Sequence, residues 1–136
     1  MNGLVKYKTE IEVKVLAPSL EELLRDNLGT MNNILKSGGC DNLDHFDCQM
    51  SAEISADNAT DLLVDFLSDI LSLTYMHKNL FCNVYFSELS ENSISAHLYG
   101  KWMDGFDKRI RGVSYLGTHA GRNGENIWES HVIFDM

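Results

Sequence analysis

The sequence predicts a single α+β domain, a two-layer α/β sandwich in which two helices cover one face of a mixed sheet. Residues 58–76 repeat their apolar side chains with a helical period. Residues 5–16 alternate apolar and charged side chains, as a strand with one buried face does. Four further strand-like segments follow residue 79, so the predicted order is β-α-β-α-β-β-β-β. Helices stacked on one sheet face are a common layer arrangement for such an order.

Length, charge and cysteine content limit the class of protein. The chain has 136 residues, which fits one domain over 1–136 with a substantial core. Its net charge of −9 argues against direct nucleic-acid binding but permits a basic protein partner or cations. We find no apolar signal segment and no apolar run that could span a membrane. The three cysteines have no CxxC spacing, so we expect reduced thiols and a cytoplasmic protein.

The first half of the chain is expected to be strand, helix, strand. The strand at residues 5–16 ends at Pro18, which cannot donate a hydrogen bond to a sheet. A helix then begins at Ser19, where Glu22 completes a capping box, and it ends at the glycines 38–39. Residues 46–55 alternate loosely and are predicted to form the second strand.

The helix over residues 58–76 organises the rest of the chain. Asn58 is its expected N-cap, with Asp61 at the third position. The strands that follow are expected at residues 80–89, 93–102, 109–118 and 126–134. Asn123-Gly124 predicts a two-residue type I′ hairpin between the last two. The expected core residues are Leu24, Leu28, Leu63, Phe66, Leu67, Ile70, Val13, Val15 and Ile133.

The residues with catalytic or metal-binding chemistry form no familiar motif. A cluster between Cys40 and Cys48 consists of Asp41, Asp44, His45 and Asp47. Two cysteines so far apart do not form a zinc knuckle, so a solvated loop is favoured over a metal site. Spacings typical of phosphate-binding loops, dinucleotide folds, serine hydrolases or zinc proteases are absent. A Cys/His nucleophile pair is conceivable, but Cys82 lies in an expected strand and suits a buried thiol. The sequence therefore predicts that the protein is not an enzyme.

Several segments together resemble the archease family, whose members activate the RNA-splicing ligase in tRNA maturation and RNA repair. The second expected helix contains LLVDFLSDIL, which is similar to the family's LLVDWLNELL. SLEELL resembles TLEEAF at the start of the first helix, and IRGVSY resembles VKAITY. The chain ends in VIFDM, and archeases end in VIFDI. The order of elements also agrees, so the resemblance covers nearly the whole chain.

The resemblance implies a divalent-cation site at the C-terminus. Archeases open with DHTAD, whose last aspartate binds the cation together with the aspartate and the terminal residue at the chain end. Counting back from SLEE places Glu10 at that aspartate, while Asp135 and Met136 match the other two ligands. The implied cation is calcium, magnesium or manganese. Arg111 stands at the lysine of VKAITY and keeps its charge but not its shape.

The first segment departs from the family pattern. Lys6 and Tyr7 replace the first Asp and His, and Lys8 lies two residues from Glu10 on the same expected strand face. An ammonium group there can neutralise Glu10 and compete with a cation. Two arrangements therefore remain open: a cation site, or a salt-bridge cluster of Glu10, Lys8, Arg111 and Asp135.

The resemblance also implies a function. It implies a non-catalytic activator that has an RNA-splicing ligase as its protein partner and promotes the guanylylation and turnover of that ligase. The alternative is an archease-fold binding module or chaperone-like protein that has lost ligase activation and metal binding. The altered DHTAD segment favours this alternative.

Overall fold

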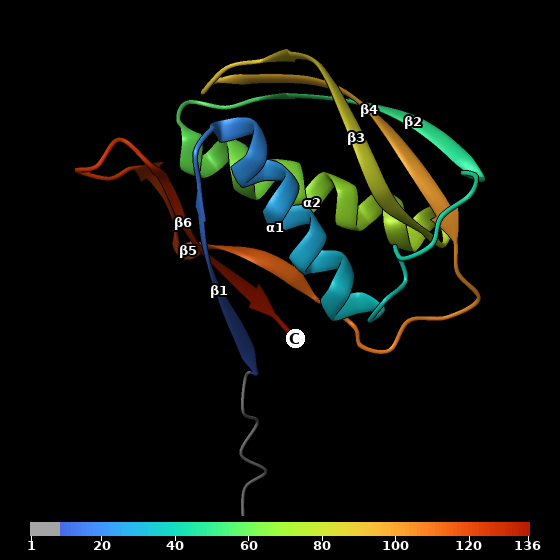
Figure 1. Cartoon of the computed structure of the whole chain (residues 1–136). Helices are drawn as coiled ribbons and strands as arrows, with labels where there is room; N and C mark the ends of the chain where they lie inside the picture. The colour runs from blue at the N-terminus through green and yellow to red at the C-terminus, as the bar shows by residue number, and fades with distance from the viewer. Residues whose placement is uncertain (1–8) are drawn as a thin grey trace, which may run out of the picture.

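The computed structural model describes residues 9–136 and arranges them as two helices between two three-stranded antiparallel sheets (Figure 1). The elements are β1 (Glu10–Ala17), α1 (Leu20–Leu35), β2 (Cys48–Ser55), α2 (Ala59–His77), β3 (Asn79–Leu89), β4 (Ser93–Trp102), β5 (Gly112–Arg122) and β6 (Trp128–Asp135). The first sheet has the strand order β1-β6-β5, and the second has the order β2-β4-β3. The α+β class and the predicted order of elements are confirmed.

The arrangement of the strands differs from the single mixed sheet that we predicted. All four strand pairings are antiparallel, and the structure forms two separate sheets. Helix α1 contacts β1 and β3, and helix α2 contacts β5 as well as β2 and β3, so both helices touch both sheets. A helix between two layers must bury more than one of its sides. Accordingly, Val64 and Leu71 are buried together with the apolar stripe of α2.

The expected helix caps are present. The Ser19 hydroxyl accepts a hydrogen bond from the backbone N–H of Glu22 at 3.2 Å, at the start of α1. The Asn58 side chain accepts one from the backbone N–H of Asp61 at 2.9 Å, at the start of α2. These bonds satisfy backbone donors that have no partner within the helix. Helix α2 ends at His77, and its C-cap Lys78 adopts the left-handed conformation with φ of 53°.

Most of the predicted core is confirmed. Val13 and Val15 are half-buried and pack against the core, but Ile133 lies outside it. Residues alternate between the two faces of a strand, and β6 directs Val132 and Phe134 inward, so Ile133 is on the outer face. The predicted residues that are buried are Leu24, Leu28, Leu63, Phe66, Leu67 and Ile70.

The connection from β5 to β6 is longer than the predicted two-residue hairpin. It spans residues 123–127, and its positive-φ residue is Asn126 at 61°, whereas a type I′ turn would require positive φ at Asn123 and Gly124. The Asn123 side chain accepts hydrogen bonds from the backbone N–H groups of Glu125 and Ile127, at 2.9 and 3.2 Å. This side-chain turn takes the place of the I′ geometry.

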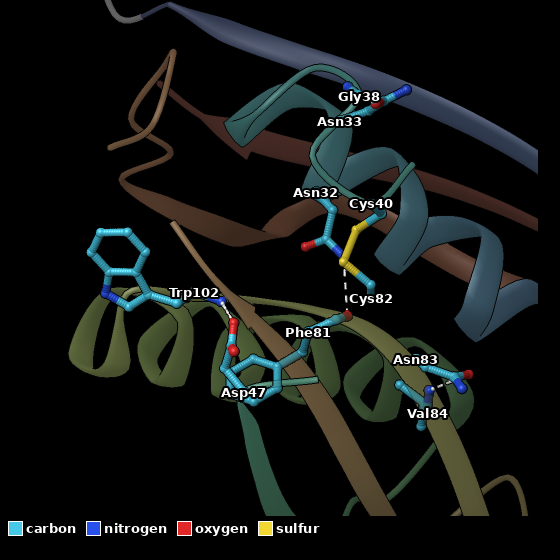
Figure 2. The surroundings of a disulfide bond; sticks show 10 residues. All are labelled: Asn32, Asn33, Gly38, Cys40, Asp47, Phe81, Cys82, Asn83, Val84 and Trp102. Atoms are coloured by element: carbon cyan, nitrogen blue, oxygen red, sulfur yellow. Dashed lines mark hydrogen bonds between the residues drawn. A yellow bond between two sulfur atoms is a disulfide. The ribbon is translucent and has the colours of Figure 1, made fainter. Parts of the chain in front are cut away.

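The prediction of three reduced thiols is wrong, because Cys40 and Cys82 form a disulfide with a Cα–Cα distance of 5.5 Å (Figure 2). The bond ties the segment after α1 to strand β3, and Cys48 is the free cysteine. Beside it, the Asn32 side-chain amide donates to the backbone carbonyl of Phe81 at 3.1 Å. The inference from reduced thiols to a cytoplasmic location therefore loses its basis.

Among the described residues, no helix combines the length and apolar character needed to cross a membrane.

Candidate functional site

The end of β6 is held on both sides by neighbouring strands. Asp135 lies opposite Glu10 of β1 and opposite Gly112 of β5, so it occupies the central strand of its sheet. The Asp135 backbone carbonyl accepts a hydrogen bond from the N–H of Arg111 at 2.6 Å. The N–H of Met136 donates to the carbonyl of Thr9 at 2.9 Å, which continues the pairing past the strand. The last residues of the chain are therefore fixed in position by backbone hydrogen bonds.

Glu10 and Asp135 direct their side chains to the same outer face of the sheet. Residues directly opposite each other on antiparallel strands share a face, with Cβ atoms about 5 Å apart. Phe134, the neighbour of Asp135, points the other way and is fully buried. Within residues 9–136, neither carboxylate has a Lys, Arg or His partner within 4.0 Å. The fold thus places two carboxylates face to face, and residues 9–136 supply no cationic side chain that pairs with either of them.

A hollow of about 240 Å³ opens at this point of the molecule. Arg111 is exposed and lines it together with Asp135, with which it forms no ion pair, whereas Glu10 is not among the lining residues. Lys8, which the sequence places two residues from Glu10 on the same expected strand face, lies outside the described residues, as do Lys6 and Tyr7. The remaining lining residues are Thr9, Gly112 and Met136.

The donor set at the end of β6 fits a hard divalent cation. Within residues 9–136, no three His, Cys, Asp or Glu side chains are grouped to hold a metal ion. The side chains supply two carboxylates here, those of Glu10 and Asp135, and the resemblance implies the carboxylate of Met136 as the third ligand. Carboxylate oxygens are the ligands that calcium, magnesium and manganese prefer. The described side chains therefore supply two of the three ligands that the resemblance implies.

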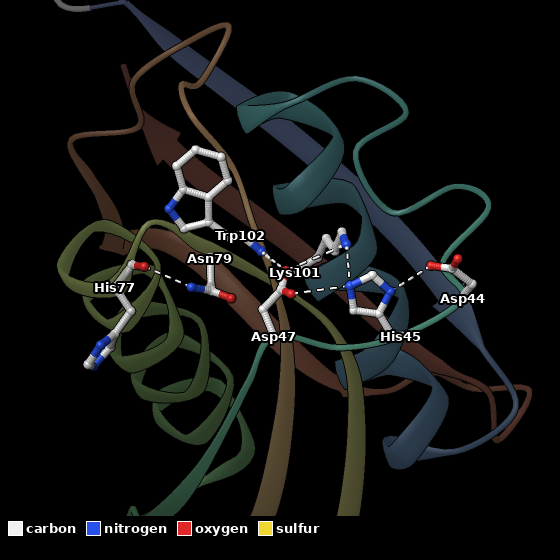
Figure 3. A network of polar contacts seen from close by, with 7 residues as sticks. All are labelled: Asp44, His45, Asp47, His77, Asn79, Lys101 and Trp102. Carbon is white, nitrogen blue, oxygen red and sulfur yellow. Dashed lines mark hydrogen bonds and ion pairs between the residues drawn. The ribbon is translucent and has the colours of Figure 1, made fainter.

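The second cluster singled out in the sequence forms a polar network in the loop before β2 (Figure 3). The ring of His45 contacts Asp44 through Nδ1 at 2.8 Å and Asp47 through Nε2 at 3.3 Å. The Lys101 ammonium lies 3.6 Å from Asp47, which also accepts a hydrogen bond from the backbone N–H of Trp102 at 2.9 Å. That backbone bond is the main reason that the pKa of Asp47 is lowered. Asp47 is paired with Lys101 and both carboxylates contact the ring of His45, which agrees with the structural interpretation of this loop.

Tyr115 and Asp65 form a contact that the sequence analysis did not predict. The Tyr115 hydroxyl donates a hydrogen bond to the Asp65 carboxylate, from strand β5 to helix α2. No local pattern indicates this contact, because the two residues are 50 positions apart. The sequence analysis also did not predict Thr9 and Gly112, which line the hollow at the end of β6.

Comparison with known proteins agrees with this geometry. The fold, with two helices and two three-stranded antiparallel sheets, is that of a small α+β protein of the archease type. Residues 4–136 match the Archease protein family. The chain belongs to the archease family. None of the curated proteins matches the chain.

Two solved structures are similar to this chain over nearly all of its length. One is the crystal structure of a Thermotoga maritima archease, described as a possible chaperone, with 14% identity and a TM-score of 0.66; the match covers 100% of this chain and 98% of that one. The other is the solution structure of Methanobacterium thermoautotrophicum protein 1598, with 14% identity and a TM-score of 0.71 over 97% and 96% of the two chains. At this identity the likeness concerns the fold.

Proposed function

We propose that this protein is a non-catalytic activator of an RNA-splicing (tRNA) ligase and that it promotes the guanylylation and turnover of the ligase. Membership of the archease family supports this proposal. The net charge of −9 suits a protein partner whose own active site handles RNA and is therefore basic. The protein contacts the ligase and not the nucleic acid.

In the proposed mechanism, Glu10, Asp135 and the carboxylate of Met136 would hold a divalent cation at the end of β6. A bound calcium, magnesium or manganese ion supplies positive charge to nucleotide phosphates. Arg111, which lines the same hollow, contacts the ligase or its guanylate, and Lys8 is assigned the same role. The backbone bonds on both sides of Asp135 keep the carboxylates in position as the protein docks.

The observation that carries the proposal is the direct pairing of Glu10 with Asp135. Like charges directly opposite each other on neighbouring strands are destabilising, by up to about 1 kcal/mol. The described residues offer neither carboxylate an ion pair. A site that receives a positive charge from outside explains why both acids are present here.

The second candidate is an archease-fold binding module or chaperone-like protein that activates no ligase and binds no metal. The observation that favours it is the altered DHTAD segment, in which Lys6 and Tyr7 replace the first Asp and His and Glu10 replaces the last Asp. Arg111 also replaces the lysine of VKAITY. Glutamate reaches one methylene further than aspartate, and arginine differs from lysine in shape. The description of the T. maritima archease as a possible chaperone fits this candidate too.

The test is a guanylylation assay with the RNA ligase of the same organism. The ligase is incubated with GTP and Mg²⁺ or Mn²⁺, with and without this protein, and the guanylylated ligase is quantified over time. We expect the wild-type protein to accelerate guanylylation and to support repeated turnover with an RNA substrate. Asp135→Asn should abolish the acceleration, because it removes one of the paired carboxylates.

The matched control is Glu125→Gln, which makes the same chemical change in the β5–β6 connection at the other end of strand β6. This variant should activate the ligase as well as the wild type. Full activation by Asp135→Asn, or no activation by the wild type at any excess, contradicts the proposal. The second outcome, combined with capture of the ligase in a pull-down, would favour the binding module.

A further inference from the structure

Strand β2 is an unpaired edge of the second sheet. The edges of the two sheets are β1, β5, β2 and β3. Register shifts interrupt the pairing of β3 and β5, and β1 carries three charged residues. Strand β2 pairs with β4 without interruption over eight residues, contains no proline and has one charged residue, Glu53. Charges, prolines and bulges are the usual features that prevent a free edge from pairing with another chain. Strand β2 is therefore the least protected edge of the described molecule.

The backbone groups of Ser51 and Glu53 point away from the sheet. The N–H of Ala56 donates to the carbonyl of Asn92, which marks this pair as hydrogen-bonded. Hydrogen-bonded and non-bonded pairs alternate along an antiparallel ladder. The same register then places Ile54 and the other even-numbered residues in bonded pairs with β4. Ser51 and Glu53 consequently offer both their N–H and C=O groups to the free side of the strand.

A groove of about 320 Å³ runs along this free edge between β2 and α2. One wall is formed by Ser51, Ala52 and Glu53 of the strand, and the other by Asp69, Ser72 and Leu73 of the helix. The groove lies next to the very residues that expose unpaired backbone groups. It therefore gives an added strand both hydrogen-bonding partners and a surface for its side chains.

The groove is negatively charged. Asp69 lies on the helix wall, Asp65 is one turn earlier on the same helix, and Glu53 is on the strand wall. Burial against the groove raises the pKa of Asp69, and the negative charge of Asp65 raises it further. Within residues 9–136, neither Glu53 nor Asp69 has a cationic side chain within 4.0 Å. A cation bound beside Asp69 would relieve the repulsion between the two helix carboxylates.

We propose that the free edge of β2 binds an extended, basic segment of a partner protein. The segment adds to the second sheet as a fourth strand, by hydrogen bonds to the backbone of Ser51 and Glu53, and places a lysine or arginine against Asp69. Backbone pairing supplies affinity in this mode of recognition, and alternate side chains supply specificity. Charge complementarity selects a basic segment. This surface lies on the other sheet from the end of β6, and the inference does not rest on the proposed ligase activation.

The test uses an eight-residue peptide of alternating lysine and valine, titrated into ¹⁵N-labelled full-length protein. Chemical-shift changes should centre on residues 49–55 and 69–73, and the amide hydrogens of Ser51 and Glu53 should exchange more slowly in the complex. Two control peptides separate the contribution of backbone pairing from that of charge. One has N-methyl groups on the amides that would pair with β2, and the other has glutamate in place of lysine. Both controls should bind at least about tenfold more weakly, because one lacks the strand donors and the other has the wrong charge.

Protein variants test the same contact from the other side. Ser51→Pro removes an N–H that makes no bond to β4, so the variant should fold and lose peptide binding. Asp69→Asn should weaken binding about twofold to fivefold, as expected for one exposed ion pair. Asp26→Asn makes the same chemical change on the exposed surface of α1 and should bind as the wild type does. If Ser51→Pro fails to fold, the N-methylated peptide still reports on the backbone bonds.

Several results would overturn the proposal. One is equal binding of the N-methylated and unmodified peptides, which would indicate attraction of charge alone. Another is the absence of binding at millimolar peptide, and a third is a set of shift changes located away from β2 and α2. A dimer in analytical ultracentrifugation that Ser51→Pro dissociates would assign the edge to a second copy of this chain instead.

Discussion

The hydroxyl of Tyr115 donates a hydrogen bond to the carboxylate of Asp65 and so joins an irregular part of β5 to helix α2. In this part, Ser114 lies opposite Ile133 and His119 opposite His131, so β5 carries extra residues that its partner lacks. The extra residues form a bulge with Leu116 at its tip, 89% exposed. The bond to Asp65 therefore holds a protruding segment against the helix.

This bond predicts an altered titration of Tyr115. Its hydrogen bond to Asp65, followed by burial and by the charges of the α2 aspartates, raises the pKa of Tyr115 to about 12. The raised pKa means that the stabilisation is complete below the unfolded pKa of about 10 and is lost as the pH rises towards 12. Phenolate absorbance against pH, compared between the wild type and Tyr115→Phe, should show one tyrosine titrating near pH 12.

Asp65→Asn is the complementary variant for this titration. It removes the main cause of the shift, so the pKa of Tyr115 should fall towards that of an ordinary tyrosine. Tyr75 provides an internal comparison, because its pKa is raised chiefly by burial and should not respond to the change. An unchanged high-pH titration in Asp65→Asn would show that the bond does not set the pKa.

Phe66 is fully buried at the centre of α2, where its ring lies 5.8 Å from that of Phe86. We expect Phe66→Ala to lower the free energy of unfolding by about 3–5 kcal/mol, because it leaves a cavity between the two sheets. Urea unfolding followed by circular dichroism measures the change. Met76→Ala is the control at an exposed position of the same helix and should cost less than about 1 kcal/mol. A similar loss in both variants would mean that the helix is not packed as described.

The Cys40–Cys82 disulfide closes a loop between residues 42 positions apart. Removing such a bond typically lowers the free energy of unfolding by about 2–4 kcal/mol, mainly because the unfolded chain gains conformational entropy. We expect this loss on reduction with a dithiol or in Cys40→Ala. Alkylation of the unfolded, unreduced protein should label Cys48 alone. Three labelled cysteines in protein taken from its own cells would mean that the bond is absent there, as in a reducing cytoplasm.

Cation binding at the end of β6 should be visible in thermal unfolding. A ligand that binds the folded state at 100 times its dissociation constant stabilises it by about 2.7 kcal/mol. We expect millimolar calcium, magnesium or manganese to raise the Tm of the wild type and of Glu125→Gln. Glu10→Gln and Asp135→Asn should lose this response, since each removes one of the paired carboxylates. An equal rise of the Tm in all four proteins would place any bound cation elsewhere.

The sequence by itself determined the local structure of this protein. The period of apolar side chains and the caps at Ser19 and Asn58 located both helices to within a few residues. Alternation located the strands, and the order of the elements followed from both. These features depend on residues close together in the chain, whose geometry is set by backbone sterics and by burial of one face. The family was also evident from the sequence, in the order and spacing of its short segments.

The tertiary structure decided which strands pair and which side chains meet. The division into two sheets, the disulfide and the bond from Tyr115 to Asp65 all join segments that are distant in the sequence. Local periodicity specifies only that a segment has a face to bury, and several pairings satisfy that requirement equally well. The resemblance to archeases indicated Glu10 and Asp135 as site residues. Only the antiparallel pairing of β1 with β6 places these two residues opposite each other. Strands β1 and β6 lie side by side because both bury their inner faces in the same core. Neither strand contains a local sequence signal that specifies the other as its partner.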